Sequence, residues 1–267
     1  MKTSGRVLAE KVAKIKDSKI FSIRSPNLPT WCPGCGYFGI HQGLNNAIQQ
    51  LELPHHEVVT VSGIGCAGRY PFFARTYGLH TVHGRALPVA TGVKLANPRL
   101  TVFAVGGDGD GLGIGGGHIP HIARRDIDVT YLLFDNSIYG LTKGQPSPSS
   151  PVGFKTKASP SGTTDAPLNA TLMALSYGAT FVARLFAGDP ETITAALVEG
   201  IQHKGFSFFH IYSTCVTFDK QFKTWDHLHE WVHPLPGSHD PTDLKQAMNE
   251  ALQDQFSLGI FYRQRKE

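Results

Sequence analysis

The sequence contains no apolar run that approaches the roughly 18 residues of a membrane-spanning helix. Behind its first lysines it also lacks the apolar core, roughly 7–15 residues long, that marks a secretory signal peptide. These absences argue against the membrane-spanning and exported classes of protein. We therefore expect a soluble, cytoplasmic protein with no membrane partner.

Charged residues are also scarce: they make up 17% of the chain and leave a formal net charge of only +4. The basic residues are scattered except at the two ends, and no basic stripe with interleaved aromatic residues is present. We therefore expect no nucleic-acid partner. The small positive excess suits anionic cofactors and substrates.

Glycine, by contrast, is abundant, with 29 residues that gather at 106–117. An apolar run stops at a GGDG sequence containing Asp108, and the next run stops at Asp135 and Asn136. Glycine after a buried strand lets backbone amides approach a ligand, and oxygen donors at two strand ends suit Mg2+. The stretch predicts a site for a metal-bound phosphate. The alternatives are a turn without a ligand and a dinucleotide-binding loop, whose third glycine is replaced here by His118.

The chain has only four cysteines, spaced CxxC, then 30 residues, then 148 residues. Cys32 and Cys35 lie at the start of a predicted helix that runs to Leu51, and Cys66 and Cys215 each follow a predicted buried strand. A disulfide is disfavoured in a chain without an export signal. The spacing is compatible with three interpretations of the cysteines: ligands of a 4Fe-4S cluster, ligands of a zinc site, and unligated buried thiols.

Apolar runs alternate with helical patterns, which predicts a doubly wound α/β domain with a mostly parallel sheet. We assign 1–30 to an N-terminal arm, 31–215 to the α/β domain and 216–267 to a C-terminal packing tail. Segment 146–167 is rich in Pro and Ser and long for a loop. We expect it to be an ordered excursion over a partner subunit, with a disordered linker as the alternative. Strands are predicted at 58–62, 81–82, 100–105, 129–134, 180–183 and 206–212, and helices at 31–51, 86–95, 168–177, 191–203 and 243–256.

The sequence GDG, followed by 26 residues and then Asn136, resembles the diphosphate-binding motif of thiamine diphosphate enzymes. The resemblance implies that Asp108, Asn136 and the backbone carbonyl of Ile138 bind Mg2+. The family often has two asparagines where this chain has Asp135 and Asn136. Asp135 is therefore not assigned as a ligand.

Six features together resemble the β subunit of 2-oxoacid:ferredoxin oxidoreductases: WCPGCG, GIGC, HGRALPVATGVK, GGDGD, FDNSIYGLTKGQ and the late cysteine. They run in that order from Trp31 to Cys215. The resemblance implies a thiamine diphosphate-binding fold in which one 4Fe-4S cluster is held by Cys32, Cys35, Cys66 and Cys215. It also implies that the cofactor is contacted by Gly65, Cys66, His83, Gly107, Asp108, Gly109, Asn136, Ile138, Tyr139, Gly140 and Leu141.

The same resemblance implies an activity, the coenzyme A-dependent oxidative decarboxylation of a 2-oxoacid, with electrons passed through the cluster to ferredoxin or flavodoxin. Lys143 favours 2-oxoglutarate, because a flexible point charge suits its second carboxylate. Pyruvate and broad 2-oxoacid use are the alternatives. We predict that His83, Arg69 and Lys143 act in catalysis. His83 would donate a proton or orient a ligand, and Arg69, like Arg85, would pair with a carboxylate or diphosphate.

We find no second thiamine diphosphate-type domain in the 267 residues. The resemblance therefore implies an α subunit that holds the pyrimidine-binding domain, its activating Glu and the coenzyme A site, in an α2β2 assembly. Two hypotheses compete. The four cysteines argue against a non-redox thiamine diphosphate decarboxylase or carboligase, and the pairing of Asp108 with Asn136 argues against a non-catalytic, zinc-stabilised interaction subunit.

Overall fold

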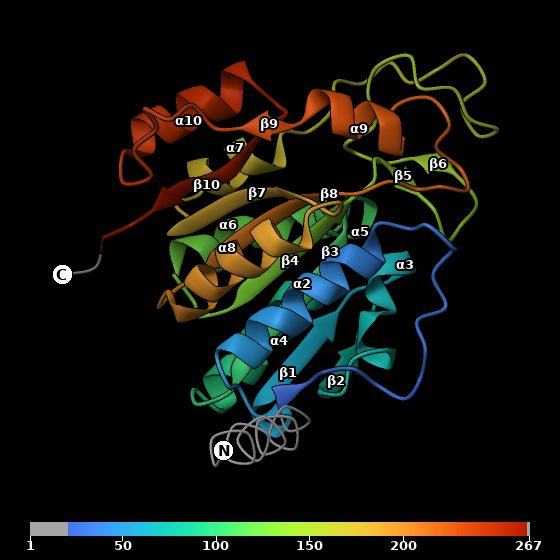
Figure 1. The fold of residues 1–267 in the computed structure, drawn as a ribbon. Coiled ribbons are helices and arrows are strands. Elements are labelled where there is room, and N and C mark those ends of the chain that lie inside the picture. The colour runs from blue at the N-terminus through green and yellow to red at the C-terminus, as the bar shows by residue number, and fades with distance from the viewer. Residues whose placement is uncertain (1–20, 266–267) are drawn as a thin grey trace, which may run out of the picture.

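The computed structural model describes residues 21–265 and is built around one sheet of eight strands (Figure 1). The strand order is β2-β1-β3-β4-β8-β7-β10-β9, and all neighbours pair in parallel except β10 and β7, which are antiparallel. This topology confirms the predicted doubly wound α/β fold. The strands are β1 (Val58–Ser62), β2 (Tyr77–His80), β3 (Thr101–Gly107), β4 (Thr130–Asp135), β7 (Phe181–Phe186), β8 (Ser207–Tyr212), β9 (His233–Pro234) and β10 (Ser257–Arg263).

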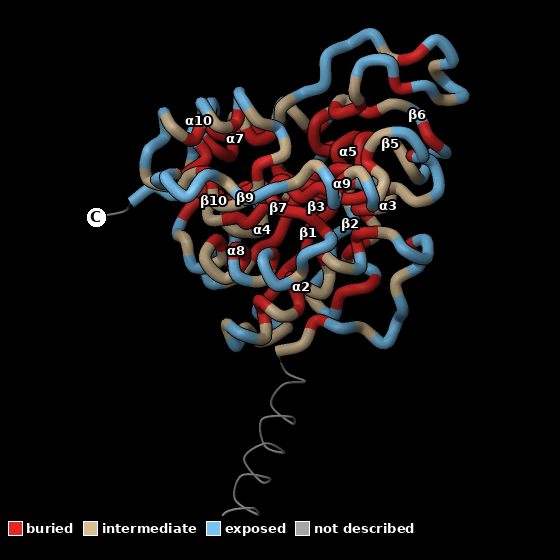
Figure 2. The backbone as a smooth tube through the Cα atoms, turned by 45° about the horizontal axis from the view of Figure 1, so that its top comes forward, coloured by how far each residue is buried: buried red, intermediate tan, exposed pale blue. Residues whose placement is uncertain are grey.

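Alternating side chains along the central strands pack into two hydrophobic cores, one on each face of the sheet. On β3, Phe103 and Val105 pack into one core, whereas Val102 and Ala104 pack into the other. The first core is covered by α2 (Tyr37–Gln50) and α8 (Pro190–Gln202). The second is covered by α4 (Ala86–Ala96), α6 (Ile119–Arg124), α7 (Ala170–Ser176) and α10 (Leu244–Gln253). Figure 2 shows buried backbone running through the central strands and exposed residues on the outer turns.

Several short elements lie at the edge of the sheet where the parallel strands end. They are the helices α3 (Gly65–Gly68), α5 (Asp108–Leu112) and α9 (Trp225–Trp231), the 3-10 turns Tyr70–Phe72 and Gly116–His118, and the small sheet of β5 (Ile138–Tyr139) and β6 (Gln145–Pro146). Another 3-10 turn, His55–Glu57, directly precedes β1. The strand order reverses between β1 and β3. Ligands of open α/β sheets bind at such a switch point, outside the carboxyl ends of the strands.

Several predicted elements differ from the observed ones. The predicted strand at 81–82 is wrong, because the edge strand β2 precedes it and is exposed along its whole length, without an apolar run to mark it. The predicted helix at 31–51 begins only at Tyr37, after the cysteine pair, because Gly34 has a positive φ of 80° and closes a turn before the helix. The predicted helix at 243–256 ends at Gln253.

The C-terminal segment adds a strand that the sequence did not predict. β10 pairs with β7, and Phe261 is fully buried in the same core as Val102. The residues after 215 therefore extend the central sheet, while the predicted boundary at 215–216 stays a prediction. The predicted arm lies mostly outside the described residues, which begin at 21. Within 21–265 no helix is both long and apolar enough to cross a bilayer.

Candidate cofactor and metal site

The carboxyl ends of β1, β3 and β4 surround a cavity of about 350 Å³, which we call the cofactor cavity. Every residue predicted to contact the cofactor lines it, from Gly65 after β1 to Leu141 after β5. The strands bring these residues together because β1 and β4 both pair in parallel with β3. The complete lining is Tyr37, Ile64, Gly65, Cys66, Ala67, His83, Gly107, Asp108, Gly109, Asp110, Asn136, Ile138, Tyr139, Gly140, Leu141, Thr142 and Gln145.

Asp108 is the first residue of α5 and is buried, with 1% of its surface exposed. Its Oδ2 accepts a hydrogen bond from the Ser147 hydroxyl and lies 3.0 Å from the Ser149 hydroxyl, and its Oδ1 faces the backbone N–H of Asn136 at 3.4 Å. Burial, followed by the nearby charge of Asp135, raises the pKa of Asp108 to about 7. In the described part of the chain no ion pair reaches this carboxylate. A cation would offset its buried charge.

Asn136 follows β4 on the other side of the same cavity. Its Nδ2 donates to the Tyr37 hydroxyl at 3.0 Å, which leaves Oδ1 as the acceptor, and the Ile138 amide donates to that oxygen at 3.2 Å. A carboxylate, an amide oxygen and a backbone carbonyl are the hard oxygen donors that Mg2+ prefers. The residues present therefore fit the predicted metal.

Asp135, one residue earlier, has a different environment. Its Oδ2 contacts His210 Nε2 at 2.7 Å and Lys223 Nζ at 2.9 Å, and its Oδ1 accepts from Ser149 at 2.7 Å. Burial alone would raise the pKa of Asp135, but Lys223 and His210 outweigh it and hold that pKa below its usual range. Because Lys223 already offsets its buried charge, Asp135 does not need a cation as Asp108 does.

The long segment after β6 supplies part of this site. Besides the bonds to Asp108, Ser149 contacts Asp135, and the Ser150 hydroxyl donates to the Ser137 carbonyl at 2.6 Å. The segment is thus hydrogen-bonded to its own chain, so it is not the disordered linker of the alternative interpretation. Sequence reasoning missed these serines, whose only signal was their density after Pro146.

All four cysteines line a second cavity of about 260 Å³, which we call the cysteine cavity. All four are free, and burial raises the pKa of Cys35 to about 12 and that of Cys66 to about 11. A β-carbon added at Gly140 would lie 3.5 Å from the sulfurs of both Cys66 and Cys215. Among residues 21–265 no three His, Cys, Asp or Glu side chains converge to hold a single metal ion. Four free thiols around one cavity are the kind of donor that both a cluster and a zinc site use.

The two cavities share a wall, formed by Tyr37, Cys66, Asn136, Gly140 and Leu141. Arg69 and Lys143, predicted to act in catalysis, line the cysteine cavity and not the cofactor cavity. Arg69 also lies over the Phe73 ring, 5.4 Å from its centroid. His83, the third predicted catalytic residue, does line the cofactor cavity.

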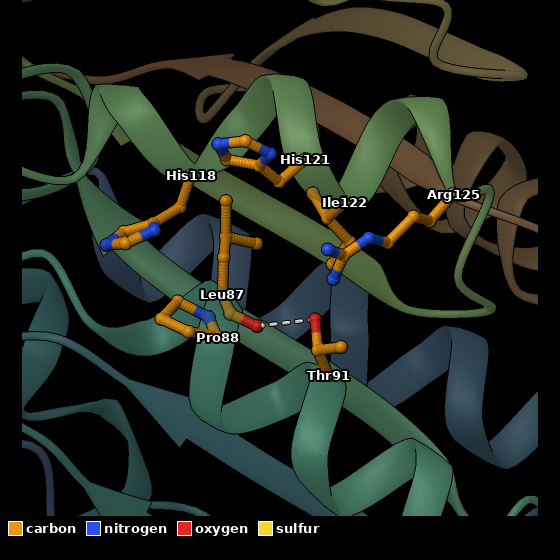
Figure 3. Close-up of a pocket in the computed structure, with 7 residues that line it drawn as sticks. All are labelled: Leu87, Pro88, Thr91, His118, His121, Ile122 and Arg125. Carbon is orange, nitrogen blue, oxygen red and sulfur yellow. Dashed lines mark hydrogen bonds between the residues drawn. The ribbon is translucent and has the colours of Figure 1, made fainter.

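Arg85 has a partner other than the predicted carboxylate or diphosphate. Its guanidinium lies 2.8 Å from His118 Nε2, and it lines neither cavity. His118 also lines a separate hollow of about 330 Å³ between α4 and α6, together with Leu87, Pro88, Thr91, His121, Ile122 and Arg125 (Figure 3). None of the predicted cofactor or cluster residues lines this hollow.

Two family models match the chain. That of the thiamine pyrophosphate enzyme, C-terminal TPP binding domain, matches residues 63–211, and that of the C-terminal part of the pyruvate ferredoxin oxidoreductase beta subunit matches 215–267. The β subunit of 2-oxoacid:ferredoxin oxidoreductase from Saccharolobus solfataricus is 41% identical over 248 residues, which cover 87% of this chain and 81% of that one. The chain belongs to the family of 2-oxoacid:ferredoxin oxidoreductase β subunits. The predicted resemblance is confirmed, and with it an oxidoreductase subunit with a thiamine diphosphate-binding fold.

Two further members of this family have more specific names. The 2-oxoglutarate oxidoreductase subunit KorB of Mycobacterium tuberculosis is 47% identical over 71% of this chain and 51% of its own length. A solved structure from Magnetococcus marinus, a 2-oxoglutarate:ferredoxin oxidoreductase with 2-oxoglutarate, coenzyme A and succinyl-CoA bound, is 43% identical. The match covers 92% of this chain and 84% of that chain, with a TM-score of 0.89.

Proposed function

We propose that this chain is the β subunit of a 2-oxoglutarate:ferredoxin oxidoreductase that binds thiamine diphosphate, Mg2+ and one 4Fe-4S cluster. It would work in an α2β2 assembly, in which the pyrimidine-binding domain and the coenzyme A site belong to the α subunit. The observation that carries this proposal is the wall shared by the cofactor cavity and the cysteine cavity. A cofactor on one side of that wall can pass electrons directly to a cluster on the other.

The bound groups would supply the chemistry and the protein their placement. Thiamine diphosphate, when bound, supplies the carbanion chemistry that releases CO2 from a 2-oxoacid, and the cluster takes the electrons singly for ferredoxin or flavodoxin. Asp108, Asn136 and the carbonyl of Ile138 would hold the Mg2+ that binds the diphosphate. Ser147 and Ser149 orient the Asp108 carboxylate through their hydroxyls.

Side chains around the two cavities have further roles in this proposal. Tyr139 and Leu141 would cover the cofactor, and its reactive end would face His83, which lines the same cavity. Cys32, Cys35, Cys66 and Cys215 would hold the cluster. The Thr217 hydroxyl, 3.1 Å from the Cys32 sulfur, would donate to one of its thiolates. Arg69 in the same cavity would offset part of their negative charge.

For the substrate, 2-oxoglutarate is supported by the names of the mycobacterial relative and of the Magnetococcus structure. Lys143 would attract its second carboxylate from the rim of the site. A broader 2-oxoacid range is the second candidate. It is favoured by the position of Lys143, which lines the cysteine cavity and is exposed.

The experiment that tests the function is anaerobic co-purification with the α subunit, followed by reduction of methyl viologen in the presence of coenzyme A. Reduction with 2-oxoglutarate but not pyruvate, lost when coenzyme A is omitted, is the expected result. Reduction with both acids would establish the broader range. An iron-free complex that releases CO2 without reducing the dye would replace the proposal with a non-redox thiamine diphosphate enzyme.

A further inference from the structure

Asp110, the second aspartate of the GDGD sequence, is a buried carboxylate at the edge of the cofactor cavity, with 4% of its surface exposed. Its Oδ1 receives three contacts from two neighbouring loops. The amides of Ile64 and Gly84 donate to it at 3.0 and 2.8 Å, and the His83 ring nitrogen Nδ1 lies 2.9 Å away. The loops that follow β1 and β2 are therefore joined at this one oxygen.

These contacts fix which nitrogen of His83 carries a proton. Two backbone N–H groups donate to Oδ1, so this oxygen is their acceptor, and a hydrogen placed on it would crowd both donors. The nitrogen facing it, His83 Nδ1, must therefore be an N–H donor. In a neutral imidazole the other nitrogen, Nε2, is then the acceptor.

The carboxylate also has no room to turn. Its Oδ2 is buried without a hydrogen-bond partner, and a β-carbon added at Gly63 would lie 1.9 Å from it. Gly63 and the two backbone amides thus hold the plane of the carboxylate in place. Within residues 21–265 His83 is also the only side chain that can form an ion pair with Asp110.

We infer that Asp110 is a positioning residue that binds the Nδ1 proton of His83, so that Nε2 is the ring nitrogen available to the cofactor cavity. The ring is partly exposed, at 38%, and lies at right angles to Tyr139, with the centroids 6.3 Å apart. Held in this way, Nε2 accepts a proton from a bound ligand and the Asp110 carboxylate stabilises the imidazolium that forms. An acid–base group oriented by a third residue recurs in unrelated enzymes.

The tautomer can be read directly by 15N NMR of the full chain labelled at histidine. The His83 signals, identified by their loss in His83→Gln, should show a protonated Nδ1 and an unprotonated Nε2. Asp110→Ala should shift the ring toward the Nε2–H form that imidazole side chains favour in water. Asp110→Asn is the matched control: the Ile64 and Gly84 amides still require an acceptor there, so its amide oxygen should keep Nδ1 protonated. A protonated Nε2 in the unchanged chain, or an Asp110→Ala spectrum like that of Asp110→Asn, would overturn the inference.

A second, kinetic experiment rests on the proposed function and uses the complete αβ complex. General acid–base groups typically contribute about 10²- to 10⁴-fold, so His83→Gln should lower kcat by about 10²-fold or more while changing KM little. Asp110→Ala should lower kcat comparably, and the double variant should be no slower than His83→Gln alone. Multiplied losses in the double variant would instead assign Asp110 a separate role and refute the pairing. A complex that is inactive with every 2-oxoacid would remove the proposed function but leave the tautomer result standing.

Discussion

The cofactor cavity and the cysteine cavity share a wall, yet they are assembled in different ways. Asp108 and Asn136 follow the adjacent strands β3 and β4, so two strand ends and their parallel register bring the proposed metal ligands together. The cysteines come from the turn before α2, helix α3 after β1 and the loop after β8, so only the complete strand order gathers them. A motif at two strand ends can be read from the sequence by its spacing, whereas a site with dispersed ligands requires the fold.

Removal of one cysteine should have the largest effect and should affect the cysteine cavity alone. Cys215→Ala should lose the cluster, with iron falling well below the expected ~4 per chain and substrate-dependent dye reduction abolished. Thiamine diphosphate binding, measured by tryptophan fluorescence, should persist because its ligands are separate. Val216→Ala, which alters the same cavity without touching a thiol, is the control. A full complement of iron in Cys215→Ala would refute the assignment of the cluster ligands.

The second prediction concerns a substitution in the cofactor cavity that should leave the cysteine cavity intact. Asp108→Asn keeps the shape of the side chain but removes the charge that would bind Mg2+, and we expect affinity for thiamine diphosphate with Mg2+ to fall by about 10²-fold or more. Iron content should not change. Asp128→Asn, at a partly exposed carboxylate paired with Lys94, is the matched control. Calorimetric titration with the cofactor measures the effect, and an unchanged affinity would remove Asp108 from the metal site.

A change in the shared wall should affect both cavities. A β-carbon at Gly140 already approaches two cysteine sulfurs at 3.5 Å, and the branched side chain of Gly140→Val fills more of that space. Overpacking typically costs ~1–3 kcal/mol, so we expect about a tenfold loss of cofactor affinity together with an altered electron paramagnetic resonance spectrum of the cluster. Gly237→Val places the same side chain where nothing lies within 4 Å. Defects confined to one cavity would show that the wall does not couple them.

The sequence predicted the class of fold and the strands β1, β3, β4, β7 and β8, because these depend on apolar runs. The resemblance left Asp135 unassigned, but the sequence could not show why it differs from Asp108, which occupies the equivalent strand end. The difference is made by Lys223 and His210, which are distant in sequence and reach only one of the two carboxylates. Asp110 was missed for a similar reason, since its partners come from two other loops.

The C-terminal strand shows a further limit of sequence reasoning. Residues 257–263 alternate too weakly to be recognised, with Ser257 and Phe261 buried and the positions between them only partly so. The strand forms because the edge of β7 is available for antiparallel pairing, and this depends on tertiary structure. The edge strand β2 was misplaced for the same reason: its stability comes from its pairing with β1.

Substitution of Lys143 has the smallest expected effect on activity. It also tests most sharply which of the two cavities a residue serves. Predicted to serve the substrate, Lys143 lines the cysteine cavity, while Leu141 and Thr142 just before it line the cofactor cavity. Its φ of 78° lies in the left-handed region, so replacement by glycine would also relax the backbone. Lys143→Gln avoids that complication, and Lys204→Gln, at a lysine side chain that is 78% exposed, is its control.

An exposed ion pair is worth about 1 kcal/mol or less, so Lys143→Gln should raise the KM for 2-oxoglutarate by no more than about fivefold. The KM for pyruvate should not change, because pyruvate has no second carboxylate to lose a partner. Steady-state assays with both acids measure this difference. Equal effects on the two KM values, accompanied by a lower reduction potential of the cluster, would assign the lysine to the cysteine cavity. Its charge would then stabilise the reduced cluster, and substrate choice would depend on residues of the α subunit.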